Sequence, residues 1–282
     1  LAVVGTNVGE ISAILEAPEL ERPAAEMKLN GLGIRMDHVS FAYRQEDGEV
    51  LHDVNLDIQP GTVTALVGPS GGGKSTAARL IARFWDVTDG CIAIGGVDIR
   101  NLTLKQLADQ VSFVTQDNFL FDCSLKENIR LGKPDATEEE VWAAARAAQC
   151  EEFLGRLEHG WDTPAGEAGK QLSGGERQRI ALARAILKDA PIVVLDEASS
   201  FADPENEAKI QKAFEALMKG KTVLMIAHRL STVRNMDRIL VIRDGGIAEE
   251  GKHDELLQKG GVYAAMWEEY QKAAQWKVGG VA

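Results

Sequence analysis

The sequence predicts an α/β fold in which a parallel sheet is joined to antiparallel hairpins and to a helical segment. Two continuous apolar runs, PIVVLDE at 191–197 and KTVLMIAH at 221–228, end in polar residues, as buried parallel strands do when functional groups follow them. Turn signals at Gly95-Gly96 and at Asp244-Gly245-Gly246 divide other strand-like runs into hairpins. Residues 117–170 are mainly helical in pattern. These observations predict an α/β core with a helical insertion.

The order of the elements follows from periodicity and turn residues. Residues 1–17 carry apolar residues at helical spacing and precede Pro18 and Pro23, which predicts a short amphipathic helix and then an extended linker. The compact domain is expected to begin near Leu32, with strands within 34–43, 50–58, 62–68 and 91–99. Thr137 and Glu140 form a capping-box signature at the start of a helix. One or two terminal helices are expected over 254–276.

Composition excludes several classes of protein. A chain of 282 residues with 45% hydrophobic residues can bury a substantial core, which argues against disorder. The chain has a net charge of −12 and therefore lacks the excess of basic residues that is typical of nucleic-acid binders, so no nucleic-acid partner is expected. Cys91, Cys123 and Cys150 are widely spaced and suggest neither a disulfide framework nor a zinc site. No run of 18 apolar residues occurs, and because the chain opens with Leu1 we expect a processed chain or a fragment.

A phosphate-binding loop is predicted at residues 68–75. The sequence GPSGGGKS fits the pattern GxxxxGK[ST], follows a predicted strand and precedes a helix-compatible run. Glycines let backbone N–H groups surround phosphates, Lys74 adds a positive charge, and Ser75 offers a hydroxyl to Mg²⁺. The alternative is an ordinary glycine-rich turn, but a chance match has a probability of only about 1–2%. The nucleotide-binding residues expected here are Gly68, Ser70, Gly71, Gly72, Gly73, Lys74, Ser75 and Thr76.

A second anion site is predicted at residues 172–179. The sequence LSGGERQR opens a helix-compatible run, where Ser173 can cap the helix while Gly174 and Gly175 let backbone amides approach an anion. This segment resembles the LSGGQ signature of the ATP-binding cassette (ABC) ATPases, with Glu176 in place of the usual glutamine. The resemblance implies a P-loop NTPase core and an anion that is the γ-phosphate of ATP held by the opposite subunit.

Other elements of that family follow in family order over residues 32–270. Residues 192–197 resemble the Walker B motif, in which Asp196 would hold Mg²⁺ and Glu197 would act as general base. Gln116 resembles the Q-loop glutamine that senses Mg²⁺ and touches the transmembrane partner, and His228 resembles the switch histidine at the γ-phosphate. Taken alone, a loop glutamine such as Gln116 is usually a solvated residue, a histidine such as His228 is usually structural, and acids at the end of a strand can simply be solvated. Asp203 is retained in the D-loop, which crosses the dimer interface in the family.

Tyr43 resembles the aromatic residue that stacks on adenine in this family. It lies 31 residues before Lys74, and stacking on a base is favourable and tolerant of base identity. The alternative is simple packing, because Phe41 and Tyr43 share one face of a predicted strand.

The sequence most resembles the exporter branch of the ABC family. Residues 166–169 (GEAG) resemble the X-loop, which contacts intracellular loops of the membrane domain, and IAHRLSTV and GKHDELL are also exporter-like. The resemblance implies that residues 1–31 form the end of a transmembrane-domain helix and a linker. It also implies that residues 32–282 form an ABC ATPase domain, with a helical subdomain at about 117–188. It implies an ATP- and Mg²⁺-dependent ATPase at the cytoplasmic face of the inner membrane.

Two partners follow from this resemblance: an ABC transmembrane domain and a second nucleotide-binding domain. Phe201-Ala202 departs from the usual D-loop sequence, so the sequence does not decide whether the domain forms a homodimer or a heterodimer. The alternatives are a soluble ABC ATPase outside transport and a degenerate cassette that only binds ATP. The cargo is not indicated, because substrate contacts belong to the membrane portion.

Overall fold

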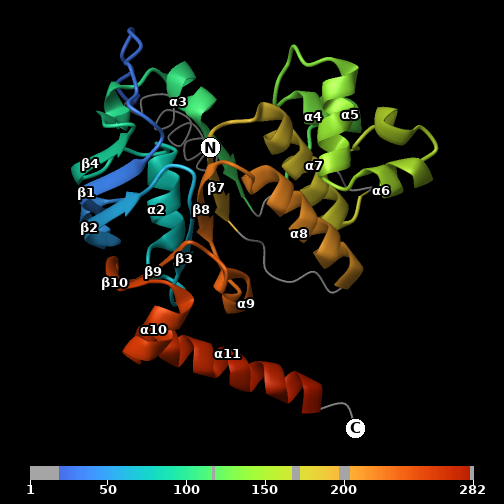
Figure 1. The fold of residues 1–282 in the computed structure, drawn as a ribbon. Coiled ribbons are helices and arrows are strands. Elements are labelled where there is room, and N and C mark those ends of the chain that lie inside the picture. Colours follow the sequence, from blue (N-terminus) through green and yellow to red (C-terminus); the bar gives the residue numbers. More distant parts are fainter. Residues whose placement is uncertain (1–18, 116–117, 167–171, 197–203, 280–282) are drawn as a thin grey trace, which may run out of the picture.

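The computed structural model describes residues 19–115, 118–166, 172–196 and 204–279, and the helix expected over 1–17 lies outside them. The predicted α/β core is confirmed as a six-stranded sheet of order β10-β9-β3-β8-β7-β6 (Figure 1). All neighbouring strands run parallel except β10, which pairs antiparallel with β9 across the predicted turn. The strands are β3 (Val63–Val67), β6 (Val111–Val114), β7 (Ile192–Asp196), β8 (Thr222–Ile226), β9 (Arg238–Arg243) and β10 (Gly246–Gly251).

A second, antiparallel sheet forms from the hairpin-rich first part of the chain. Its order is β2-β1-β4-β5, with β1 (Ile34–Phe41), β2 (Leu51–Ile58), β4 (Asp89–Ile94) and β5 (Val97–Asp98). The short helices η1 (Gln45–Asp47), α2 (Lys74–Ile81), η2 (Ile99–Asn101) and α3 (Leu104–Gln110) belong to this part. One hydrophobic core joins β1, β2 and β4 to α2 and to the parallel sheet, so α2 is fixed between the two sheets.

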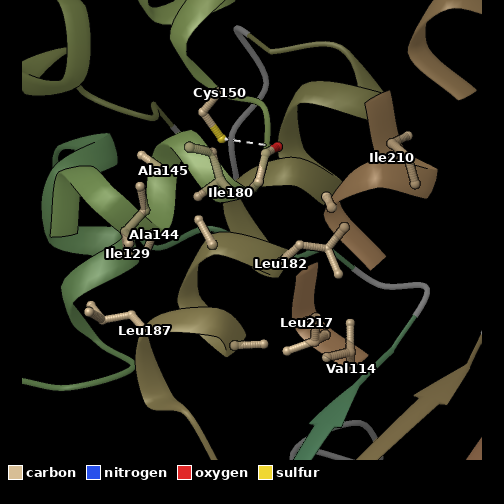
Figure 2. Packing of buried hydrophobic residues seen from close by; sticks show 14 of the residues in the cluster. Val114, Ile129, Ala144, Ala145, Cys150, Ile180, Leu182, Leu187, Ile210 and Leu217 are labelled. Atoms are coloured by element: carbon tan, nitrogen blue, oxygen red, sulfur yellow. Dashed lines mark hydrogen bonds between the residues drawn. The ribbon is translucent and has the colours of Figure 1, made fainter. Parts of the chain in front are cut away.

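The helical subdomain packs on the β6–β7 edge of the parallel sheet. It contains α4 (Leu125–Arg130), α5 (Glu138–Ala147), α6 (Glu151–Arg156), η3 (Gly160–Asp162) and α7 (Gly174–Lys188), and α8 (Pro204–Met218) lies against α7. Figure 2 shows Ile180 and Leu182 of α7 at the centre of its core, with Ile210 and Leu217 of α8 beside them. The predicted capping box is present, since Thr137 Oγ1 accepts from Glu140 N at 3.2 Å and Glu140 accepts from Thr137 N at 2.8 Å.

Two terminal helices follow β10, where one or two were predicted. They are α10 (His253–Lys259) and α11 (Val262–Gly279), and the short helix α9 (Leu230–Val233) lies earlier in the chain, between β8 and β9. The Glu249 carboxylate accepts hydrogen bonds from Val262 N and Tyr263 N, both at 2.9 Å, which fixes the start of α11. From there α11 extends away from the sheet (Figure 1). None of the helices within the described ranges is long and apolar enough to cross a membrane.

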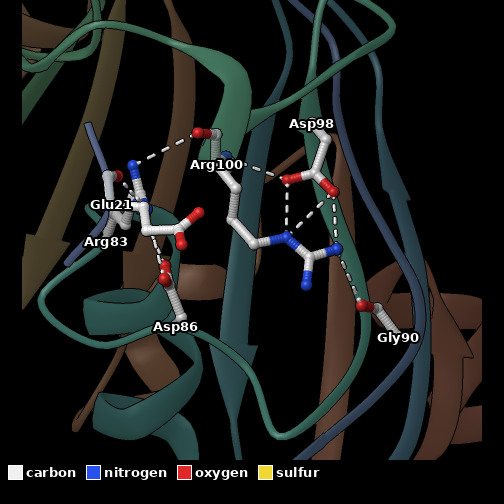
Figure 3. A network of polar contacts seen from close by, with 6 residues as sticks. All are labelled: Glu21, Arg83, Asp86, Gly90, Asp98 and Arg100. Carbon is white, nitrogen blue, oxygen red and sulfur yellow. Dashed lines mark hydrogen bonds and ion pairs between the residues drawn. The ribbon is translucent and has the colours of Figure 1, made fainter. Parts of the chain in front are cut away.

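Residues 19–31 contain neither helix nor strand, as expected for an extended linker, but they are hydrogen bonded along the domain. Arg83 donates to Glu21 O at 2.8 Å and pairs with Asp86 at 2.7 Å (Figure 3). Farther along, Asn30 N donates to Gly95 O at 2.8 Å. The linker segment is therefore held against the antiparallel sheet and the turn after α2.

Candidate functional site

The site lies where neighbouring parallel strands end. β8 lies between β3 and β7, so residues that follow these three strands meet at one edge of the sheet. The phosphate-binding loop follows β3, Asp196 ends β7, and His228 comes two residues after β8. Gln116 follows β6 and Glu197 follows β7, but both lie outside the described residues, as does Asp203. Of the expected X-loop, only Gly166 is described.

The loop between β3 and α2 needs its glycines for two different reasons. Gly68 has φ of +146° and a Cβ there would lie 2.0 Å from Ile242 O of β9. Gly73 has φ of +99° and a Cβ there would lie 2.6 Å from a methyl group of Leu51. Gly71, with φ of +79°, has open space around it but adopts a backbone conformation that favours glycine. The loop therefore packs closely against β2 and β9 while its outer turn stays open.

Lys74 begins α2 and folds back over the loop. Its ammonium donates to Gly68 O at 2.9 Å and to Pro69 O at 2.8 Å, and the residue is only 7% exposed. Burial lowers the pKa of Lys74, and the negative charge of Asp196 partly opposes that shift. A desolvated ammonium at a helix N-terminus is a strong partner for a phosphate group.

A depression of about 280 Å³ opens beside this lysine. It is lined by Val50, Ser70, Gly71, Gly73, Lys74, Ser75, Thr76 and His228. The structure thus brings the loop hydroxyls and Lys74 to the same hollow as His228, which lies far from them in the sequence. In the described part of the chain, no signature residue lines it.

His228 and Asp196 are in direct contact. The Nε2 atom of His228 lies 3.1 Å from Oδ1 of Asp196, whose side chain is largely buried while the histidine is about one-third exposed. The carboxylate can therefore orient the imidazole ring that lines the depression.

Tyr43 lies just beyond the end of β1 and remains 42% exposed. Its hydroxyl lies 2.9 Å from Thr76 Oγ1 of α2, and its ring meets those of Phe41 at 4.9 Å and Trp85 at 5.1 Å, edge to face. Of the two aromatic residues Phe41 and Tyr43, only Phe41 is buried in the core. Tyr43 is thus held beside the phosphate-binding helix with part of its surface open.

The signature segment forms a complete helix start. Ser173 Oγ accepts from Glu176 N at 3.2 Å, and Glu176 accepts from Ser173 N at 2.8 Å, which is a capping box at the N-terminus of α7. Glu176 also pairs with Arg156 of α6 at 3.0 Å. Gly174 is half-buried, and a Cβ on Gly175 would lie 3.3 Å from Asn206 of α8. The glutamate that departs from the family sequence therefore has a capping role here.

Arg179 was not singled out from the sequence. It is only 2% exposed, donates to Gln149 O at 2.7 Å and to Asn206 Oδ1 at 3.0 Å, and lies over the Phe153 ring at 4.9 Å. Its spacing could have indicated that it is buried. It lies four residues after the buried Gly175 and four before the buried Ala183, so all three residues share one face of α7. This guanidinium joins the signature helix to α8.

Comparison with known proteins identifies the family. Residues 51–200, more than half of the chain, match the sequence model described as ABC transporter. The chain belongs to the ABC transporter family. It is 52% identical over 238 residues to the mycobactin import ATP-binding/permease protein IrtA of Mycolicibacterium smegmatis, covering 84% of this chain and 27% of the relative. It is 50% identical over 248 residues to the ATP-dependent lipid A-core flippase of Syntrophus aciditrophicus, covering 88% of this chain and 40% of the relative.

A solved bacterial Atm1-family ABC exporter with ATP bound has the same fold. The TM-score is 0.85 at 40% sequence identity, over 93% of this chain and 46% of the exporter chain. The ABC chain therefore spans less than half the length of each of these three proteins. The match confirms the predicted exporter-type resemblance, and the described domain is an ATP-binding ATPase domain of the ABC family.

Proposed function

We propose that this domain binds ATP with Mg²⁺ in the depression beside Lys74 and hydrolyses it to drive transport by a membrane portion. The observation that carries the proposal is the meeting of Lys74, Ser75 and His228 in one hollow, with Asp196 on the histidine. Fixed positive charge and backbone amides at the start of α2 suit the β- and γ-phosphates. Tyr43 is 42% exposed, which leaves part of its ring available for stacking on adenine.

The donor set suits Mg²⁺. In proteins this ion is bound through one or two side-chain oxygens together with substrate phosphates and water. The Ser75 hydroxyl and the Asp196 carboxylate are such oxygens, and Gln116 would add an amide oxygen. Among the described residues there is no group of three or more His, Cys, Asp or Glu side chains that could enclose an ion. Bound there, Mg²⁺ would neutralise charge that develops on the phosphates.

We assign the chemical roles as follows. Glu197 orients the attacking water and accepts its proton, and His228, which contacts Asp196 before nucleotide binds, donates a hydrogen bond to the γ-phosphate. Lys74 exchanges its bonds to Gly68 O and Pro69 O for phosphate oxygens. Each of these groups acts where negative charge accumulates in phosphoryl transfer.

The capped start of α7 supplies the other half of the site from a second domain. Ser173, Gly174 and Gly175 form an anion-binding helix N-terminus that does not line the depression of its own chain, within the described residues. A head-to-tail pair of domains would bring each signature over the other's phosphate loop, with Asp203 near the interface. This arrangement encloses two ATP molecules between the domains.

The decisive experiment compares the wild-type domain with Glu197→Gln. We expect the variant to keep ATP binding, to lose about 10²–10³-fold in the rate of phosphate release, and to accumulate as an ATP-bound dimer. Steady-state phosphate release and size-exclusion chromatography with ATP measure both effects. Removal of Mg²⁺ with EDTA should abolish turnover in the wild type. Hydrolysis by Glu197→Gln at the wild-type rate would show that another group is the base.

A cleft of about 290 Å³ between β6 and α7 is the surface that we assign to the membrane portion. Phe119 and Leu131 line it at 54% and 49% exposure, and Phe121 meets the ring of Phe119 at 5.1 Å. Exposed aromatic side chains around a cleft are typical of a protein interface. The relatives named ATP-binding/permease proteins favour a transmembrane domain as the occupant, which would hold this ATPase at the cytoplasmic face of the inner membrane.

Phe119→Ser tests this surface because Phe119 is not among the described residues that line the depression beside Lys74. In the full-length protein reconstituted in vesicles, we expect it to keep ATP binding by the domain and to reduce transport-coupled ATP hydrolysis. Leu104→Ser, an exposed apolar residue at the start of α3, is the matched control. If transport-coupled ATP hydrolysis were the same in both variants, the cleft would not be part of the interface with the membrane portion. The relatives carry different cargo names, import of mycobactin and flipping of lipid A-core, so no cargo is proposed.

A further inference from the structure

A tryptophan-lined slot lies on the helical subdomain, away from the ATP site. It has a volume of about 610 Å³ and is lined by Glu138, Glu139, Trp142, Glu151, Leu154, Gly155, Gly160 and Trp161. These residues belong to α5, α6 and η3, and α6 lies at the end of the molecule opposite the antiparallel sheet (Figure 1). A volume of this size is typical of sites for small organic ligands.

The walls of the slot are aromatic and aliphatic. The rings of Trp142 and Trp161 meet edge to face with centroids 4.7 Å apart, and both pack on the hydrophobic core of the subdomain. Leu154 is buried beneath them, and Gly155 leaves open space, since nothing lies within 4 Å of a Cβ placed on it. Two rigid indoles and a missing side chain give an apolar hollow that accepts a flat or rounded apolar group.

The rim of the slot is acidic. Glu138 and Glu139 begin α5 and Glu151 begins α6, so both helices place carboxylates at the same opening. The helix dipoles stabilise these charges, which explains part of their presence. Glu138 pairs with Lys126 at 3.1 Å, whereas Glu139 and Glu151 make no ion pair with any described residue. Negative charge at the opening is therefore not fully compensated.

The structure also shows a cation held against one wall residue of the slot, although the lysine that carries it does not line the slot. The ammonium of Lys126 lies 5.3 Å from the centroid of the Trp161 ring and pairs with Glu138 and, at 2.9 Å, with Asp162. One indole of the slot thus already carries a cation between carboxylates. Trp142, Glu139 and Glu151 offer the same combination in the open part of the slot.

We propose that this slot binds a small organic cation, an amine or quaternary centre attached to an aromatic or branched apolar body. The apolar body fills the space over Leu154 and Gly155, and the positive centre lies between the indoles and the free carboxylates. This slot is a separate site, because it shares no lining residue with the depression beside Lys74.

Tetraphenylphosphonium and tetraphenylborate test the proposal, since they have nearly the same shape and opposite charge. We expect the phosphonium to bind the whole chain one to one in isothermal titration calorimetry, and the borate to bind at least about tenfold more weakly. Glu139→Gln/Glu151→Gln should weaken phosphonium binding by about tenfold. Equal affinity for the two ions would mean simple hydrophobic adsorption and would overturn the proposal.

Gly155→Leu tests whether the ligand binds in this slot, because the new leucine side chain would fill the open space without removing an existing contact. We expect phosphonium binding to fall at least about tenfold, with Gly155→Ala as the smaller control that changes it far less. Leucine favours a helix more than glycine does, so circular dichroism should show an unchanged or higher Tm. Unchanged affinity in Gly155→Leu would place binding elsewhere. Binding of a lysine-rich peptide without binding of the phosphonium would assign the slot to a protein partner, against the proposal.

Discussion

Nε2 of His228 lies 3.1 Å from Oδ1 of Asp196, which joins the ends of two neighbouring strands of the parallel sheet. The contact fixes the imidazole at the mouth of the depression that also holds Lys74. In the role that we propose for His228 at the γ-phosphate, a freely rotating side chain would lose entropy on binding. The buried carboxylate therefore prepares the histidine before nucleotide arrives.

Substitution of this histidine should separate binding from hydrolysis. We expect His228→Ala to bind ATP with nearly wild-type affinity and to release phosphate about 10²-fold more slowly, because one charge-stabilising donor is lost. Nucleotide titration and steady-state phosphate release measure the two effects. His159→Ala, an exposed histidine near η3, is the matched control and should retain the wild-type rate. A wild-type rate in His228→Ala would remove the histidine from the reaction.

Two glycines with positive φ should differ sharply in their tolerance of alanine. Gly61 has φ of +71° with open space, so Gly61→Ala should cost only the backbone strain of about 1–2 kcal/mol. Gly68→Ala adds a Cβ 2.0 Å from Ile242 O, and we expect a cost of about 3 kcal/mol or more together with loss of ATP binding. Urea unfolding and nucleotide titration test the pair. Equal costs would mean that the loop moves freely away from β9.

The contact between Arg179 and Asn206 should stabilise the packing of α7 on α8. We expect Asn206→Ala to lower the unfolding free energy by about 1–3 kcal/mol, because it leaves a buried guanidinium N–H without its acceptor. Arg179→Met removes the charge, and in that background Asn206→Ala should cost less. Asn101→Ala, at an exposed position, is the control and should change stability by less than about 0.5 kcal/mol. Strict additivity of the two substitutions would contradict this coupling.

Local patterns predicted the fold well because most of the elements carry their own signals. The apolar runs before Asp196 and His228 became β7 and β8, and the Thr137 capping box starts α5 as expected. The family resemblance, which assigns Lys74, Asp196 and His228 to the phosphates and Mg²⁺ of one ATP molecule, implied that these residues lie close together. Periodicity does not set strand order, however, so the direct contact of His228 with Asp196 required the structure.

Features that depend on packing between distant segments could not be predicted. Arg179 is a charged residue on a buried face, and its acceptors come from Gln149 and Asn206, which are 30 and 27 positions away. The slot between Trp142 and Trp161 requires the relative orientation of α5, α6 and η3. In both cases the sequence shows the residues but not the geometry that joins them.

Ser173 and Thr137 offer a matched pair, because each caps its helix in the same reciprocal arrangement with a glutamate three residues later. Replacement of either by alanine should therefore lower the unfolding free energy by a similar amount, about 1 kcal/mol. Only Ser173 is assigned to a phosphate, so only Ser173→Ala should slow ATP hydrolysis in the paired domains. Unfolding and phosphate-release measurements on both variants make the comparison. Equal rates in the two variants would mean that the serine acts only as a helix cap, and that the proposed phosphate contact rests on the glycine amides alone.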